Sequence, residues 1–252
     1  MVAPRKGSPS VKDVPADVLV ALERGDIETA TLAETLAVDF TTLARRAFPD
    51  LPAAAISRIQ SVASKGVTVR MRAVGDVLND FSTPERIDAA GTHASDIVRG
   101  WAAYTISPTL PIDQQLETVR RFADDHHFGV REWAWLALRG SICADPFGAI
   151  NYLRHWAADP RPHIRRFAVE ATRPRGVWAT HITQLKTDPA PALPILDQVC
   201  LDSDDYVHRS VGNWLRDAAR TNPHWVIDTI NDWEQRHGQH RALERLRQRT
   251  TV

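Results

Sequence analysis

The sequence predicts an all-α fold, an α-α superhelix in which helical hairpins repeat along the chain to form a solenoid. Three observations predict it. A short motif recurs at roughly regular spacing, each copy continues with apolar residues at helical spacing, and no long segment alternates apolar and polar residues as a strand does. With 252 residues, 43% of them hydrophobic, the chain is long enough to bury a sizeable core.

The motif consists of an aliphatic residue, Arg or His, two variable positions, and Ala or Val. Successive copies begin between 29 and 43 residues apart, which is about the length of two helices and two turns. We therefore expect one helical hairpin in each repeat. The five copies are VRMRA from Val69, VRGWA from Val98, VREWA from Val130, IRRFA from Ile164 and VHRSV from Val207.

Each copy continues with apolar residues at offsets 0, 3 or 4, and 7, as in Ile164, Phe167, Ala168 and Ala171. This spacing places the apolar side chains on one stripe of a helix, so we expect them to face the core. Helix starts are predicted where a capping residue precedes a proline. These capping residues are Thr83, Asp145, Asp159, Asp188 and Asn222.

The pattern also predicts the organisation of the domain. We expect a disordered tail over residues 1–15 and a single repeat domain over residues 16–252. Within that domain, residues 16–64 give shorter and less regular helices and read as an N-terminal helical cap, residues 65–235 hold the repeats, and residues 236–252 form a C-terminal helix.

An aspartate lies five residues before the aliphatic position in the last three copies, and Arg or His follows it six residues later. In HEAT repeats, an Asp and an Arg at this separation pair with their neighbours along the stack, so the chain resembles that superfamily. We interpret these residues as structural contacts between repeats. They are Asp125 with Arg131, Asp159 with Arg165, and Asp202 with His208.

Composition excludes several classes of function. Lys and Arg balance Asp and Glu, 31 of each, so only a local basic face could bind nucleic acid. Cys143 and Cys200 lie in apolar stretches and suggest neither a disulfide framework nor a metal site. No membrane span, secretion signal, phosphate-binding glycine loop or zinc-type histidine spacing is present. We expect a monomeric cytoplasmic protein, nucleoid-associated when on DNA, without membrane contact, metal or cofactor.

A second face of each repeat helix carries polar residues. Offsets 2, 6, 9 and 10 lie on one side of the helix, away from the apolar stripe. Second helices line the concave surface of a solenoid, so we expect an Arg-rich groove with a carboxylate or amide in each repeat. The residues are Glu132 and Arg139; Arg166, Glu170 and Arg173; and Arg209, Asn213, Arg216 and Asp217.

Two segments on this face resemble the AlkC/AlkD family of alkylpurine DNA glycosylases, and the AlkC type most closely. HIRRFAVEATRPRGVWA (163–179) resembles a family helix that runs into Arg-Pro-Arg-x-x-Trp-Ala, and DDYVHRSVGNWLRDAARTNPHWV (204–226) resembles a second family segment. HHFGVREWAW, from His126, is a weaker match. We expect no C-terminal immunoglobulin-like domain of the kind that some AlkC-type members carry.

The resemblance implies an enzyme that hydrolyses the N-glycosidic bond of cationic alkylated bases, such as 3-methyladenine, in double-stranded DNA. Glu170 and Asp217 would stabilise the sugar cation and position water. The AlkC pattern has Glu where this chain has His127, and Glu132 is the alternative third carboxylate. Trp178, Asn213, His127 and Trp135 would contact the substrate, and Arg166, Arg173, Arg175, Arg209 and Arg216 the DNA phosphates.

Two other functions remain open from the sequence. The chain could be a member of the same superfamily that binds DNA without excising bases, because His127 departs from the catalytic pattern. It could also be a HEAT-type scaffold that binds protein. Steep salt dependence of DNA binding separates the scaffold from the other two, and release of methylated bases separates those two from each other.

Overall fold

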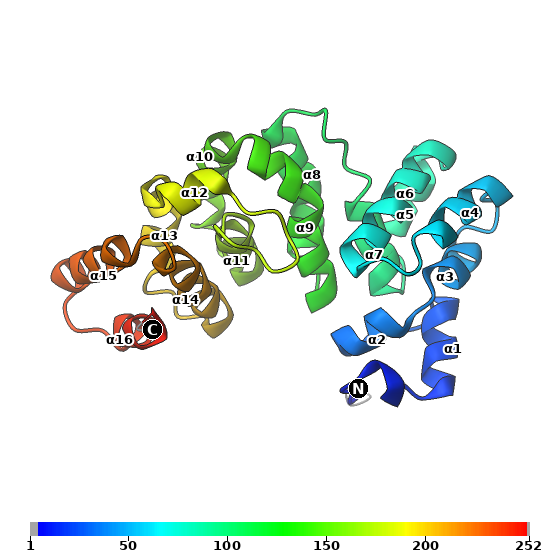
Figure 1. Ribbon diagram of the computed structural model, residues 1–252, viewed down its shortest axis with the longest axis horizontal. Helices are drawn as coiled ribbons and strands as arrows, with labels where there is room; N and C mark the ends of the chain where they lie inside the picture. Colours follow the sequence, from blue (N-terminus) through cyan, green and yellow to red (C-terminus); the bar gives the residue numbers. More distant parts are fainter. Residues whose placement is uncertain (1–4, 251–252) are drawn as a thin grey trace. The chain divides into compact units, whose positions relative to one another are not determined.

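The computed structural model describes residues 5–250, and over these residues the chain forms sixteen α-helices, two short 3-10 helices and no strand (Figure 1). The predicted all-α repeat fold is therefore confirmed. Contacts between residues divide the chain into two compact units, and the single repeat domain expected over residues 16–252 stays a prediction. The N-terminal unit holds Met1–Ile106 with Asp125–Ala137, and the C-terminal unit holds Ser107–Asp124 with Leu138–Val252.

The N-terminal unit contains the shorter helices that were expected near the start of the chain. Its helices pack in sequence order, with α1 on α3, α3 on α4, α4 on α5, and α5 on α7. Their bounds are η1 Val11–Asp13, α1 Ala16–Arg24, α2 Leu32–Ala37, α3 Phe40–Ala47, α4 Ala53–Ser61, α5 Val67–Phe81, α6 Pro84–Ala90 and α7 Asp96–Ala103.

The C-terminal unit stacks helical hairpins in two layers. One layer contains α8, α10 and α13, and the other contains α11, α14 and α16, with each helix packed on the next in its layer. α9 (Phe128–Ala144) contributes residues to both units. The other bounds are α8 Ile112–Ala123, α10 Pro146–Trp156, α11 Pro162–Ala171, α12 Thr183–Thr187, η2 Ala190–Ala192, α13 Leu193–Val199, α14 Asp205–Ala219, α15 Pro223–His237 and α16 Arg241–Thr250.

All five copies of the motif begin at the third residue of a helix, on α5, α7, α9, α11 and α14. In the last four copies the first aliphatic residue is fully buried, as the spacing predicts. The first copy differs, because Val69 is 49% exposed and α5 instead buries Val67, Met71, Val74 and Leu78. The apolar stripe of α5 starts two residues before the motif, so the longer stripe determines which face of the helix packs.

The arginine of the motif connects neighbouring repeats in the way that the HEAT resemblance implies. Arg99 donates to both carboxylate oxygens of Asp125 at 2.8 and 3.1 Å, and Arg165 donates to both oxygens of Asp202 at 2.6 and 3.0 Å. The same arginines also donate to the backbone carbonyl six residues earlier, at 2.7 Å from Arg99 and 2.9 Å from Arg165. Each arginine thus closes its own turn and holds the next repeat.

The proline-linked caps start helices at three of the five predicted places. Thr83, Asp145 and Asn222 are the N-caps of α6, α10 and α15. Asp159 and Asp188 instead accept hydrogen bonds from the backbone N–H two residues later. At these two positions the aspartate closes a turn, and the next helical segment begins further along the chain.

Residues 5–15 differ from the disordered tail that we expected over residues 1–15; residues 1–4 lie outside the described residues. Arg5 donates to both oxygens of the fully buried Glu34 at 2.6 and 2.7 Å. Glu34 also accepts from the backbone N–H groups of Ser8, at 3.0 Å, and Ala30, at 2.7 Å. The carboxylate of Glu34 accepts four hydrogen bonds and so anchors residues 5–8 to α2.

Candidate functional site

The C-terminal unit buries two carboxylates on neighbouring helices. Glu170 lies in the last turn of α11 and Asp217 in the second half of α14, and these two helices pack against each other. Glu170 is 2% exposed and Asp217 is 6% exposed. Buried carboxylates are rarely found without partners, so the groups that pair with them determine what they can do.

Arg173, two residues after α11 ends, bridges the two carboxylates. Its Nη1 donates to Oε2 of Glu170 at 3.0 Å, and its Nε and Nη2 lie 2.9 and 2.8 Å from Oδ2 of Asp217. Arg166 lies one turn earlier on α11, with Nη2 3.6 Å from Oε1 of Glu170 and its guanidinium 4.1 Å from the ring centroid of Tyr206. The cluster therefore combines two buried cations with two buried anions.

This arrangement changes the roles expected for two arginines. Arg166 and Arg173 were predicted to contact DNA phosphates, but both are buried and already engage carboxylates. A buried guanidinium whose donors are directed at Glu170 and Asp217 orients those groups rather than presenting an open fork to a phosphate.

The electrostatics of the cluster distinguish Asp217. Burial raises the pKa of Asp217, and the adjacent guanidinium of Arg173 only partly opposes that shift. Burial works against the charge on Arg173, but Glu170 and Asp217 outweigh it and raise the pKa of the guanidinium. Asp217 thus accepts a proton more readily than an ordinary aspartate does, a property that suits a general base.

The loop after α11 presents an aromatic residue to solvent. Trp178 is 55% exposed, and its neighbour Val177 is exposed as well. Trp178 has φ +57°, the only positive φ of a non-glycine residue within residues 5–250. A bulky side chain adopts this backbone conformation only where its surroundings impose it, and such strained residues concentrate at functional sites.

The remaining predicted residues of the C-terminal unit lie on or near the solvent face. Arg209 and Arg216 are exposed on α14, and Arg175 is half-buried in the loop that carries Trp178. Oδ1 of the half-buried Asn213 accepts from Nη2 of Arg216 at 2.6 Å. Arg209, Arg216 and Arg175 therefore retain exposure that suits phosphate contacts.

Glu132 and Trp135 form a pair on the part of α9 that belongs to the N-terminal unit. The indole Nε1 of Trp135 donates to Oε2 of Glu132 at 2.9 Å. Trp135 is buried and Glu132 is half-buried. Trp135 was expected to contact substrate, but the structure places its ring in the interior, with its one polar group bonded to Glu132.

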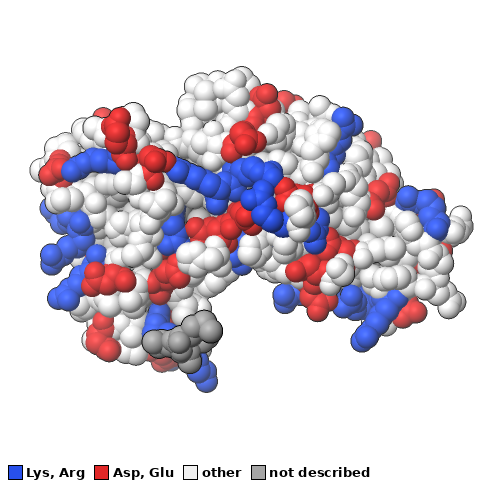
Figure 2. Space-filling model, turned by 180° about the vertical axis from the view of Figure 1, so that it is seen from behind, with Lys and Arg blue, Asp and Glu red and all other residues white. Residues whose placement is uncertain are grey.

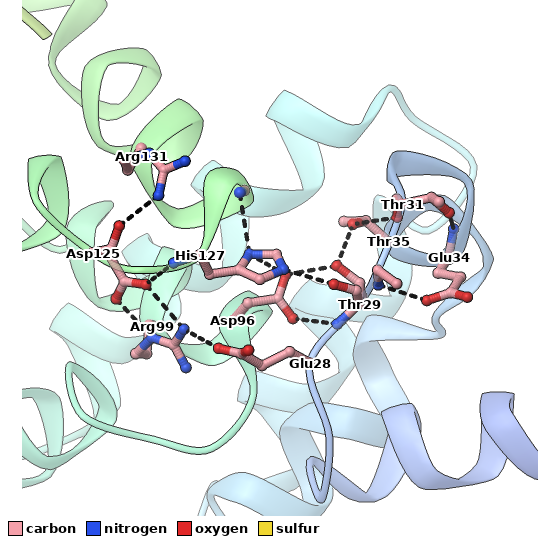
Figure 3. A network of polar contacts seen from close by, with 12 residues as sticks. Glu28, Thr29, Thr31, Glu34, Thr35, Asp96, Arg99, Asp125, His127 and Arg131 are labelled. Carbon is pink, nitrogen blue, oxygen red and sulfur yellow. Dashed lines mark hydrogen bonds and ion pairs between the residues drawn. The ribbon is translucent and has the colours of Figure 1, made fainter. Parts of the chain in front are cut away.

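His127 lies inside a polar network of the N-terminal unit (Figure 3). It is 8% exposed; its Nε2 donates to the carbonyl oxygen of Thr29 at 2.6 Å, and its Nδ1 accepts from the N–H of Gly129 at 3.1 Å. Oδ2 of the fully buried Asp96 lies 3.4 Å from Nδ1. Both ring nitrogens are therefore engaged, and the structure does not present His127 to a substrate as predicted.

The network continues through the segment before α2. Thr29 donates to Asp96 twice, from its backbone N at 2.9 Å and from Oγ1 at 2.8 Å. Glu28, one residue earlier, accepts from Arg99 at 2.5 Å and lies 2.6 Å from Nε2 of His126. The network ties this segment to the starts of α7 and α9, which is a structural task (Figure 3).

The face of the molecule drawn in Figure 2 shows both signs of charge side by side. On the face drawn in Figure 2, Lys and Arg are interspersed with Asp and Glu, as the balanced composition implies. The described residues contain no group of three or more His, Cys, Asp or Glu placed to hold a metal ion. No helix within residues 5–250 is long and apolar enough to cross a membrane.

The sequence pattern did not identify two important residues. Arg139 was placed on the polar face that lines the expected groove, and its role was not identified: it is 3% exposed and donates to three backbone carbonyls. Asp96 lies two residues before the second motif copy, where nothing in the pattern marks it as buried. A signal for Arg139 was its place in the apolar second half of its helix, where an arginine needs partners.

Comparison with protein families gives one match. Residues 139–249 match the family of DNA alkylation repair enzymes. A curated protein from Bacillus subtilis (strain 168), described as uncharacterized protein YhaZ, is 38% identical over 97 residues, which is 38% of this chain and 27% of YhaZ. The resemblance that the motifs predict is thus confirmed over the part of the chain that carries Glu170, Trp178 and Asp217.

Two solved structures share the fold. Pseudomonas fluorescens alkylpurine DNA glycosylase AlkC, bound to DNA containing an abasic site analog, matches with a TM-score of 0.66 and 20% identity, over 97% of this chain and 64% of that one. The protein smu.31 of Streptococcus mutans UA159 matches with a TM-score of 0.53 and 17% identity, over 77% of this chain and 89% of that one. The chain thus covers less than two thirds of the AlkC chain.

Proposed function

We propose that this chain is a DNA glycosylase that hydrolyses the N-glycosidic bond of cationic alkylated bases, such as 3-methyladenine. The match of residues 139–249 to DNA alkylation repair enzymes and the fold shared with the glycosylase AlkC support the proposal. The observation that carries it is the buried cluster of Glu170, Arg173 and Asp217 beside the loop of Trp178. Its partner would be double-stranded DNA with alkylated bases, bound by a monomer.

The reaction needs little acid catalysis, because an alkylated base already carries a positive charge. When the bond between C1′ and the base nitrogen breaks, the electron pair leaves with the base and neutralises it, and positive charge develops on the sugar. A water oxygen then bonds to C1′ and loses its proton. Glu170 and Asp217 would stabilise the sugar cation, and Asp217, with its raised pKa, would take the proton.

Residues on the exposed side would hold the DNA. Trp178 offers an exposed aromatic face to a sugar or a cationic base, and Asn213 offers an amide on the same helix as Asp217. Arg175, Arg209 and Arg216 would contact phosphates. Glu132 stays a candidate third carboxylate, and the rate of base release by the Glu132→Gln variant tests that role.

The test is release of bases from methylated DNA. The purified chain should release 3-methyladenine, detected by chromatography, and the double variant Glu170→Gln/Asp217→Asn should not. A gel-shift assay in rising salt supplies a second measurement, because binding through phosphates must weaken steeply.

A second function is favoured by a specific observation. His127 occupies the place of a family glutamate and is buried against Thr29, and Arg173 already occupies Glu170 and Asp217. A protein with these features could bind DNA without excising bases. Salt-sensitive binding without any base release would establish that function instead, and absence of both would leave a protein-binding scaffold.

A further inference from the structure

The loop over residues 172–182 joins α11 to α12 and carries the strained Trp178 (Figure 1). Few backbone hydrogen bonds shape it from within. The N–H of Ile182 donates to the carbonyl of Pro174 at 3.1 Å and closes the neck, and the N–H of Ala179 donates to Gly176 at 3.4 Å. These two bonds leave the left-handed backbone of Trp178 to be imposed from outside the loop.

Trp214 donates from Nε1 to the carbonyl of Thr172 at 3.0 Å, and the Sγ of Cys143 lies 3.7 Å from the carbonyls of Thr180 and His181, but Arg139, on α9, is the side chain that reaches both ends of the loop. Its Nη1 donates to the carbonyl of Ala171 at 2.9 Å, its Nη2 to that of Arg173 at 2.7 Å, and its Nε to that of Thr180 at 2.7 Å. Two of these carbonyls lie where the loop leaves α11, and the third lies two residues after Trp178. One planar guanidinium therefore fixes both ends of the loop at a set separation.

A simple cap on the end of α11 does not account for this geometry. A capping arginine would bond only the last carbonyls of the helix. Thr180 belongs to no helix, and its bond to Arg139 is as short as any of the three. Arg139 is also almost completely buried, which is costly for a guanidinium unless its donors are used.

The same arginine reaches the carboxylate cluster through one residue. Arg173 gives its backbone carbonyl to Arg139 and directs its own side chain at Glu170 and Asp217. A shift of the backbone at Arg173 would therefore move the guanidinium that orients both carboxylates. Arg139 thus connects the aromatic loop and the carboxylate cluster mechanically.

We propose that Arg139 is a positioning residue for base release. It holds the 172–182 loop so that Trp178 keeps its place and Arg173 keeps its contacts with Glu170 and Asp217. The proposal rests on the proposed glycosylase function for its effect on catalysis. Its structural half is independent of that function, because order in the loop is measurable without DNA.

Arg139→Met tests the proposal, with Arg72→Met as the matched control. Arg72 also donates to backbone carbonyls, those of Tyr104 at 3.3 Å and Ala137 at 2.5 Å, but it lies in the N-terminal unit and has no bond to the loop. Trypsin cuts after Arg175, inside the loop. Mass spectrometry measures the rate of that cleavage in the absence of DNA. We expect Arg139→Met to keep its helical circular dichroism and to speed the cut by about tenfold or more, because the loop opens locally.

Catalysis gives the second measurement. On methylated DNA, Arg139→Met should lower the single-turnover rate of base release by about 100-fold, as misplaced catalytic groups do. The Kd for DNA should change little, and Arg72→Met should leave the rate, the Kd and the loop cut as in the wild type. Arg139→Lys keeps the charge but not the planar geometry that reaches three carbonyls. Trypsin should therefore cut its loop as fast as it cuts the loop of Arg139→Met.

The outcomes separate the two proposals. A faster loop cut in Arg139→Met, with no base release by the wild type, would support the positioning role of Arg139 and refute the glycosylase function. Base release by the wild type, with an unchanged loop cut in Arg139→Met, would refute the positioning role alone. If neither Arg139→Met nor Arg139→Lys folds, Arg139 is needed for the fold itself and the positioning role is wrong.

Discussion

Asp96 in the N-terminal unit and Asp217 in the C-terminal unit are both buried aspartates, and burial raises the pKa of each. Their partners differ. Asp96 accepts from the backbone and hydroxyl of Thr29 and lies near the engaged ring of His127, whereas Asp217 is held by the side chain of Arg173.

The difference indicates which aspartate can react. The backbone N–H and the hydroxyl of Thr29 fix Asp96 in place, so the network joins chain segments that are far apart in sequence. The guanidinium of Arg173 holds Asp217 beside the loop that exposes Trp178. We therefore propose that Asp96 serves the fold and Asp217 the chemistry, and the predictions below test this contrast or extend it to other residues of the two units.

The largest effect is expected from removing the charge of the C-terminal carboxylates. Asp217→Asn or Glu170→Gln should lower the rate of base release by about 10²–10⁴-fold, the usual contribution of a general base. Asp232→Asn, an exposed carboxylate paired with Arg236, is the matched control and should leave the rate unchanged. A folded Asp217→Asn variant with full activity would place Asp217 in the same structural class as Asp96.

The next effect concerns stability. Arg173→Met removes the one side chain that bridges Glu170 and Asp217, and an uncompensated buried charge costs about 3–5 kcal/mol. Arg236→Met breaks exposed pairs and should cost at most about 1 kcal/mol. Urea unfolding compares the two variants, and equal losses would mean that solvent reaches the cluster and screens it.

His127 should affect the fold rather than the chemistry. His127→Ala leaves the carbonyl of Thr29 without its donor, which should lower the free energy of unfolding by about 1–3 kcal/mol. The rate of base release by the folded variant should match the wild type. If that rate collapses while circular dichroism is retained, the N-terminal network takes part in catalysis and the contrast between the units is wrong.

The sequence predicted the repeat because its signal is local and periodic. Ile164, Phe167 and Ala168 recur at helical spacing, and their burial follows from that spacing alone. The prediction that Val69 is buried was wrong, because a motif match does not determine the packed face when a longer apolar stripe starts two residues earlier. The pairing of Arg99 with Asp125 and of Arg165 with Asp202 was predictable because the repeat brings one residue of each type together.

The site was predictable only in part. Glu170, Trp178 and Asp217 were placed by family-like segments, but their partners depend on contacts between distant residues. Nothing in the local pattern shows that Arg173 turns toward two carboxylates 3 and 44 residues away along the chain. The burial of Arg139 likewise depends on a loop that comes later in the sequence.

The contributions of Glu34 and Asp217 to stability should depend on pH in opposite directions. Burial works to raise the pKa of Glu34, but Arg5 and the backbone amides of Ala30 and Ser8 outweigh it and lower that pKa to about 2. The stability from Glu34 is therefore full above its unfolded pKa of 4.5 and is lost as pH falls toward 2. Comparison of wild type with Glu34→Gln by urea unfolding should show a gap that closes at low pH.

The contribution of Asp217 to stability changes with pH in the opposite direction. Because its pKa is raised above 3.8 in the folded protein, its contribution is greatest below pH 3.8 and is lost as pH rises through the folded value. Against Asp217→Asn, the wild type should therefore be favoured most in acid and should lose that advantage as pH rises. A gap that instead widens with pH would show that Arg173 dominates over burial.

The smallest effect is expected at an exposed arginine of the C-terminal unit. Arg209 on α14 donates from Nε to the carbonyl of Asp205 at 3.2 Å, and its exposure suits a single phosphate contact. Arg209→Gln should weaken DNA binding without sequence preference and reduce the slope of log K against log salt by about 0.9. Arg58→Gln, an exposed arginine of the N-terminal unit paired with Asp80, is the control and should keep the wild-type slope. Equal loss of slope in both variants would mean that DNA contacts extend over both units, so that the C-terminal unit would hold the chemistry but not the whole grip on DNA.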